Sequence, residues 1–111
     1  MSRNIDDAVD FLYINGKKYA EAKAQRVYLE EFRKSKKALL MKDALANGIE
    51  AANAQEREAY SHPEYQQLLK DLQLAIEVEE NIKWMMEAAR MRVEIWKSEE
   101  YSNRMTDKAL A

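Results

Sequence analysis

Only three residues in this chain of 111 are strong helix breakers: Gly16, Gly48 and Pro63. The segments between them are rich in Ala, Leu, Glu, Lys, Arg, Gln and Met, which lose little conformational freedom on entering a helix. Breakers this widely spaced favour long helices. The sequence therefore predicts an all-α protein.

The breakers also predict how the helices connect. A long helix over 17–47 should end at Asn47-Gly48, because glycine is the favoured residue just beyond a helix C-terminus. Residues 49–60 have helical propensity but a thin apolar face, which indicates a short helical connector. Pro63 suits the first position of a second long helix over 63–106, with Ser61 or His62 as its cap. We therefore expect a single domain, 1–111, built on a long antiparallel helical hairpin with a short connecting helix.

The N-terminal region has two interpretations. Asn4 is a candidate N-cap for a helix that begins there. Asn15-Gly16 could be a turn that separates residues 1–15 as an N-terminal arm, or Gly16 could be a tolerated helix residue that costs about 1 kcal/mol relative to Ala. Asn and Gly together are a turn signal, which favours a bend.

Two apolar stripes run along the last predicted helix. A helix of this length would span about 60 Å at about 1.5 Å per residue, far beyond a compact core of this size. Two apolar faces cannot both be covered by one partner helix, so we expect a homo-oligomer, a helical bundle of coiled-coil type. The first stripe comprises Tyr65, Leu68, Leu69, Leu72, Ala75, Ile76, Ile82, Met86, Ala89, Val93 and Trp96. The candidate oligomer or partner interface comprises Leu74, Val78, Trp84, Met85, Ala88, Ile95 and Trp96.

Composition excludes several classes of protein. Hydrophobic residues make up 47% and charged residues 34%, which is too apolar for a disordered chain and too charged for a membrane protein. No apolar run approaches the roughly 20 residues that a membrane span needs. The absence of cysteine excludes disulfides and thiolate chemistry. We expect a cytoplasmic protein with no membrane partner.

Catalytic and metal-binding patterns are scarce. His62 is the one histidine, and beside Pro63 it is more typical of a helix cap than of a nucleophile's base. Glu79 interrupts the apolar stripe, where a salt-bridged residue at the core edge is far commoner than a metal ligand. Neither a Glu-x-x-His pair nor a phosphate-binding glycine loop occurs. We expect no catalytic residue, metal, cofactor or small-molecule substrate, and hence no enzyme.

The charges are unevenly distributed along the chain. Residues 17–42 carry nine basic side chains against three acidic ones, whereas residues 64–80 carry five acidic side chains and one base. The basic segment could bind nucleic acid, with Tyr28 and Phe32 stacking on bases. Alternatively, residues 33–37 lie roughly opposite 71–77 in the hairpin, so that the basic helix faces Asp71, Glu77, Glu79 and Glu80, and this charge complementarity would specify the helix register. We favour the second interpretation. The candidate nucleic-acid-binding residues are Arg26, Arg33, Lys34, Lys36, Lys37 and Lys42.

Three stretches resemble an uncharacterised family of small helical phage and prophage proteins. They are Ala54-Gln-Glu-Arg-Glu-Ala-Tyr60 with His62-Pro-Glu-Tyr65, Tyr28-Leu-Glu-Glu-Phe-Arg-Lys-Ser35, and the pattern Trp84…Ala88-Ala-Arg90…Val93-Glu-Ile-Trp96 followed by Ser98 and Ser102-Asn-Arg104. The resemblance covers about residues 20–107 and includes no catalytic signature. Members of that family tend to be encoded near replication and recombination genes, beside single-strand annealing or single-strand-binding proteins. The resemblance implies an accessory role in phage DNA metabolism, inside the bacterial host cell, and assigns no site residue.

These observations lead to one functional hypothesis and two alternatives. We expect a non-enzymatic phage protein that acts by binding, an accessory factor in DNA replication or recombination through protein–protein contacts. The first alternative is a direct single- or double-stranded nucleic-acid-binding protein that uses its basic helix face. The second is a counter-defence inhibitor of a host nuclease.

Overall fold

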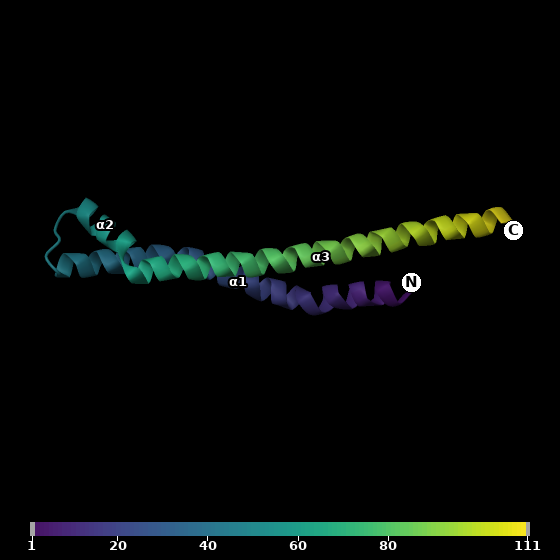
Figure 1. Cartoon of the computed structure of the whole chain (residues 1–111), viewed down its shortest axis with the longest axis horizontal. Coiled ribbons are helices and arrows are strands. Elements are labelled where there is room, and N and C mark those ends of the chain that lie inside the picture. The colour runs from purple at the N-terminus through teal and green to yellow at the C-terminus, as the bar shows by residue number, and fades with distance from the viewer. Residues whose placement is uncertain (1, 111) are drawn as a thin grey trace. The chain divides into compact units, whose positions relative to one another are not determined.

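The computed structural model describes residues 2–110, and within them the chain forms three helices and no strand. They are α1 (Ser2–Ala46), α2 (Ala52–Ser61) and α3 (Pro63–Leu110), joined in that order as Figure 1 shows. Two long helices joined through a short one form the helical hairpin that the sequence predicts, so the predicted fold class is confirmed.

The predicted turn at Asn15-Gly16 is wrong, because α1 continues through both residues. The Asn15 side chain, which can support a turn, instead donates from Nδ2 to the Phe11 carbonyl one helical turn earlier, at 2.9 Å. Residues before Gly16 therefore belong to α1 and form no separate arm. The helix begins at Ser2, ahead of Asn4. The prediction that the Asn4 side chain caps the helix is not tested, because Asn4 is not among the side chains that the structure describes.

The C-terminus of α1 matches its prediction closely. Gly48 has a φ of 96°, in the left-handed region where a Cβ atom is unfavourable. This conformation lets the Gly48 N–H donate to the Leu45 carbonyl and the Ile49 N–H donate to the Ala44 carbonyl, both at 3.0 Å. These two bonds form a Schellman motif, which satisfies carbonyl groups that the helix end leaves unpaired.

The connector is shorter than predicted, and α3 is longer. Helix α2 begins at Ala52. The side chain of Gln55, within the first turn of α2, donates from Nε2 to the carbonyls of Ile49 and Glu50 in the preceding loop. Pro63 is the first residue of α3, and His62 Nδ1 accepts a hydrogen bond from the Glu64 N–H at 3.1 Å. His62 is therefore the cap, as one of the two predicted alternatives requires. Helix α3 ends at Leu110, four residues beyond the predicted end.

The chain divides into two packed units. The hairpin unit comprises residues 21–79, and the terminal unit comprises residues 1–20 and 80–111. Each unit contains one segment of α1 and one of α3, and α2 belongs to the hairpin unit.

The core of the hairpin unit consists of two clusters. Leu29 of α1 packs with Leu68, Leu72 and Ala75 of α3, and Phe32 covers this cluster. Nearer the turn, Leu40, Ala59 and Tyr65 bring one residue from each helix together. The buried positions of α3 alternate three and four residues apart, which is the spacing of a coiled-coil seam. In this unit they are Tyr65, Leu68, Leu72, Ala75 and Glu79.

The terminal unit packs less extensively. Ala8 of α1 and Ala89 of α3 are buried, and the spacing of three and four residues recurs on α3 at half-buried side chains. Trp96, a candidate interface residue, is half-buried on this seam. The seam therefore includes most of the first apolar stripe, although Ile76 is exposed. The half-buried seam residues are Ile82, Met86, Val93 and Trp96.

Candidate partner-binding surfaces

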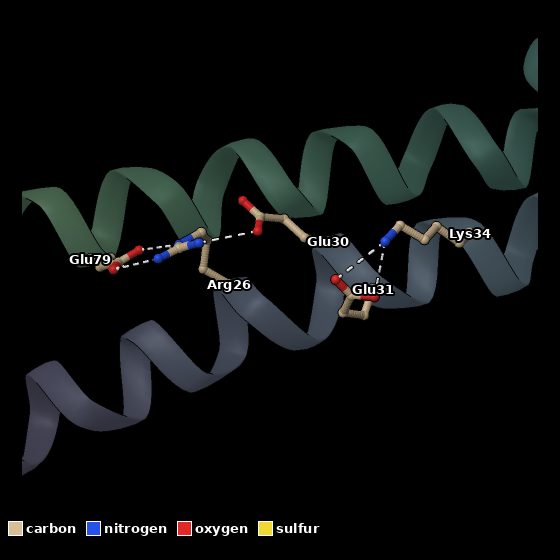
Figure 2. Close-up of polar contacts among 5 residues, drawn as sticks. All are labelled: Arg26, Glu30, Glu31, Lys34 and Glu79. Carbon is tan, nitrogen blue, oxygen red and sulfur yellow. Dashed lines mark hydrogen bonds and ion pairs between the residues drawn. The ribbon is translucent and has the colours of Figure 1, made fainter.

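A bidentate ion pair in the hairpin unit joins Arg26 of α1 to Glu79 of α3. Arg26 Nε donates to Glu79 Oε2 at 2.5 Å, and Arg26 Nη2 donates to Glu79 Oε1 at 3.1 Å. The guanidinium therefore hydrogen-bonds both carboxylate oxygens. Arg26 Nη1 also donates to Glu30 Oε2 at 3.1 Å, as Figure 2 shows. The Glu79 side chain is 8% exposed, whereas that of Arg26 is 25% exposed.

This arrangement explains an acid within an apolar seam. The hydrogen bond to Glu79 raises the pKa of Arg26 above its ordinary value, against the opposing effect of burial. A carboxylate this buried is stabilised by a bidentate cation. The interpretation of Glu79 as a salt-bridged residue at the core edge is confirmed.

Three more of the candidate nucleic-acid-binding cations are in ion pairs with carboxylates of this chain. Lys36 Nζ lies 2.8 Å from Glu64 Oε2, Lys37 Nζ lies 3.0 Å from Glu56 Oε1, and Lys34 Nζ lies 3.2 Å from Glu31 Oε2. With Arg26, four of the six candidates are therefore paired.

Of the four acids predicted to face the basic helix, all within the described residues, only Glu79 forms an ion pair with it, through Arg26. The prediction is wrong for the partners of Lys36 and Lys37. Lys36 and Lys37 pair with Glu64 and Glu56, which lie nearer the turn than Asp71 and Glu77. The difference arises because α2 packs beside the end of α1, where Ala59 contacts Leu40, so α3 begins alongside Leu40. The complementary charges do join the helices, in a register closer to the turn.

The same pairs perturb the acids near the turn. The hydrogen bond from Lys36 lowers the pKa of Glu64, and the hydrogen bond from Lys37 lowers the pKa of Glu56. Lys37 also lies 4.7 Å from the centre of the Tyr60 ring. A polar interaction with the Tyr60 side chain and, next in size, the hydrogen bond to Glu56 raise the pKa of Lys37.

The remaining nucleic-acid candidates form a weak surface. Arg33 and Lys42 are exposed, and neither has an ion pair within the described part of the chain. Tyr28 and Phe32 stack on each other with ring centres 5.8 Å apart, and Phe32 packs against the core. Of these two aromatic residues, therefore, only Tyr28 has an exposed ring on which a nucleic-acid base could stack.

A shallow apolar groove runs between α1 and α3 in the hairpin unit. Its α3 side carries Leu74 and Val78, two candidate interface residues, which are 59% and 52% exposed. Asp71 of α3 and Gln25 of α1 are its polar lining residues. Both predicted residues therefore lie on a surface that a partner can reach. The lining residues are Ala22, Gln25, Leu29, Asp71, Leu74, Ala75 and Val78.

The terminal unit has a groove of its own. Met85 and Ala88, both candidate interface residues, line it from α3 together with Arg92. The α1 side contributes Asp7, Ala8 and Phe11, which are not among the predicted interface residues. The signal for Ala8 and Phe11 is their spacing of three residues, which places both on one face of a helix.

Trp84 and Ile95 also lie on the exposed surface of the terminal unit, at 64% and 54%. Trp84 Nε1 donates to Glu80 Oε2 at 3.1 Å, and Lys83 Nζ lies 5.9 Å from its ring centre. An indole held this way keeps much of its apolar surface in water, which is costly without a partner.

Charged pairs occupy a different face of α3 in this unit. Arg90 pairs with Glu87 and Lys97 pairs with Glu94, each three residues apart along the helix. At about 100° per residue, these two ion pairs lie around the axis of α3 away from Met85 and Ala88.

Comparisons with protein-family models, curated proteins and solved structures find no match to this chain. Within residues 2–110, no cluster of three or more His, Cys, Asp or Glu side chains could hold a metal ion. None of the three described helices has a segment long and apolar enough to cross a membrane.

Proposed function

We propose that this protein acts by binding another protein through the exposed apolar surface of its helical hairpin, without a catalytic step. The observation that carries the proposal is the set of large apolar side chains exposed on α3, Leu74 and Val78 in one unit and Trp84, Met85 and Ile95 in the other. A patch of exposed apolar side chains on a charged protein usually marks an interaction site, and each unit carries its own set.

The grooves support a particular mode of binding. Each lies between two helices and has an apolar floor with a few polar side chains. These are Gln25 and Asp71 in the hairpin unit and Asp7 and Arg92 in the terminal unit. An amphipathic helix of a partner fits such a groove by inserting apolar side chains at helical spacing. Methionine on the surface suits this role because its flexible thioether adapts to a partner's shape.

The class of partner rests on the resemblance to small phage proteins. Such a protein would be an accessory factor in phage DNA replication or recombination, and its partner would be the single-strand annealing or single-strand-binding protein of the same phage. A host nuclease blocked by the same surface is the counter-defence alternative.

Direct binding of nucleic acid is the less favoured function. Phosphate contacts depend on cations that are free to displace counterions. Arg26, Lys36 and Lys37 would have to leave Glu79, Glu64 and Glu56 to make such contacts. Fluorescence anisotropy with single-stranded and duplex oligonucleotides at low salt distinguishes the two functions, and tight binding by the purified protein would favour this alternative.

Calorimetric titration against the annealing and single-strand-binding proteins tests the proposal. The variants Val78→Lys and Met85→Lys place a charge on each apolar surface, and Gln73→Lys places the same charge at another exposed position. We expect the wild type and Gln73→Lys to bind one of the two proteins and at least one of the other variants to lose binding at least tenfold. Absence of binding by the wild type, or equal binding by all variants, would contradict the proposal.

A further inference from the structure

The terminal unit exposes a face of α3 whose composition constrains what can cover it. Four apolar residues lie at its centre, and one polar residue lies at each end, Asn81 and Arg92. Met85 and Ala88 of this face also line the groove beside α1. The face comprises Asn81, Trp84, Met85, Ala88, Met91 and Arg92, all exposed.

The position of this face around α3 suits a bundle of helices. Met85 and Ala88 lie on average about 95° around the helix axis from the seam of Ile82, Met86 and Ala89, at about 100° per residue. A helix in a four-helix bundle contacts two neighbours at roughly this angular separation. Since α1 lies against the seam, a second helix can pack on the face without displacing it.

We propose that a second copy of this chain covers the face, with the two α3 helices packed antiparallel about a two-fold axis. This inference rests on the proposed function, because it names the occupant of one of the surfaces described there. In the register that we propose, Asn81 faces the second copy's Arg92, and Met85 faces the second copy's Ala88. Trp84 then lies beside the second copy's Met91, where sulfur and ring make a favourable contact. The two-fold axis repeats each contact, as a self-complementary interface requires.

The two polar residues specify this register. The Asn81 side-chain carbonyl accepts from the second copy's guanidinium, so both polar groups of the face are paired. A shift of seven residues would instead place Arg92 against Ala88 or against Leu74, and would leave its charge against an apolar side chain. Parallel pairing would place Arg92 against Arg92, which is repulsive. A single polar contact in an apolar seam fixes register in coiled coils by the same principle.

Cysteine cross-linking tests both the orientation and the register, because the native chain has no cysteine. Two variants are made, Asn81→Cys and Arg92→Cys, at exposed positions where substitution leaves the core intact. In the proposed dimer, residue 81 of one copy is level with residue 92 of the other. Two copies of the same variant have their cysteines about 16 Å apart along the axis, beyond the about 7 Å limit for a disulfide.

A mixture of the two variants should therefore form a covalent dimer under mild oxidation, whereas either variant alone should remain uncross-linked on a non-reducing gel. The mixed dimer keeps one native contact between Asn81 and Arg92, so the register that they specify is retained. Circular dichroism is the folding control, and both variants should be as helical as the wild type. Cross-linking of each variant alone would show parallel pairing, and the absence of cross-linking in the mixture would show that no such dimer forms. Either result overturns the inference, and the proposed function still stands if the chain binds the annealing or single-strand-binding protein.

Discussion

Arg26 on α1 and Glu79 on α3, 53 positions apart in the sequence, form a bidentate ion pair at the edge of an apolar seam. Charged pairs in such positions add little net stability, because both ions lose water. They specify alignment, since any slip of one helix along the other would leave the carboxylate buried without this guanidinium. In the hairpin unit this pair and the pair of Lys36 with Glu64 join α1 to α3 and set their register, whereas Lys37 pairs with Glu56 of α2.

Replacement of Arg26 by alanine should therefore destabilise the protein more than loss of an ordinary ion pair. Arg26→Ala leaves the carboxylate of Glu79, 8% exposed, without its guanidinium partner. Lys34→Ala is the matched control, because Lys34 and Glu31 form an exposed pair within α1. We expect thermal unfolding to show a clearly lower midpoint for Arg26→Ala and a nearly unchanged midpoint for Lys34→Ala. Equal midpoints would mean that the pair does not hold the register.

The two glycines should respond oppositely to the same substitution. Gly16→Ala should stabilise the protein by about 0.5–1 kcal/mol, because the site is helical and a Cβ atom would meet nothing within 4 Å. Gly48→Ala should destabilise it by about 1 kcal/mol or more, because the φ of 96° is unfavourable for alanine. Urea unfolding of both variants measures the difference. Destabilisation by Gly16→Ala would indicate that α1 is not continuous there.

Two leucines on α3 should differ in how much they contribute to the free energy of unfolding, because one is buried in the core and the other is exposed in a groove. Leu72 is 8% exposed in the core of the hairpin unit, whereas Leu74 is 59% exposed in its groove. Leu72→Ala should lower the free energy of unfolding by about 2–5 kcal/mol, and Leu74→Ala should change it by about 0.5 kcal/mol or less. Chemical denaturation at low protein concentration, where association contributes least, provides the comparison. A large loss for Leu74→Ala would show that its side chain is buried within one chain.

Acid should weaken the hairpin unit through the two glutamates near the turn. Lys36 and Lys37 lower the pKa values of Glu64 and Glu56 below the ordinary 4.5, so the unfolded chain binds protons more readily than the folded one. This stabilisation is fully present above pH 4.5 and is lost as the pH falls through the lowered values.

Unfolding midpoints measured from neutral pH down to about pH 3 should therefore decline less steeply for Glu64→Gln than for the wild type. Glu99→Gln changes an exposed glutamate with no ion pair among the described residues, and should follow the wild-type curve. Identical curves for all three proteins would rule out a contribution from the pair of Lys36 and Glu64.

The helix ends and the core face were predictable because local chemistry determines them. Gly48 needs a left-handed conformation, Pro63 cannot continue a preceding helix, and the spacing from Tyr65 to Ala75 places one face against α1. The exposed positions of Leu74, Val78 and Met85 follow from the same spacing, because one helix cannot cover both faces of α3.

The register and the role of Gly16 were not predictable from local chemistry. Asn15 and Gly16 are a turn signal in isolation, but the surrounding helix formers of α1 outweigh it. The partners of Lys36 and Lys37 depend on where α2 packs, which is determined by the contact of Ala59 with Leu40. Such long-range contacts leave no trace in spacing or composition, so the ion pairs were assigned to the wrong acids.

The central claim about assembly is that the exposed face of α3 in the terminal unit packs against the same face of a second copy, and light scattering with three proteins tests it most directly. At micromolar concentration the wild type should show twice the 13.0 kDa mass of one chain. Ala88→Glu, which places a carboxylate in that face, should show 13.0 kDa, and Arg104→Glu, which places one at an exposed position beyond it, should match the wild type. A wild-type mass of 13.0 kDa at every concentration, or an Ala88→Glu protein that remains dimeric, would contradict the claim.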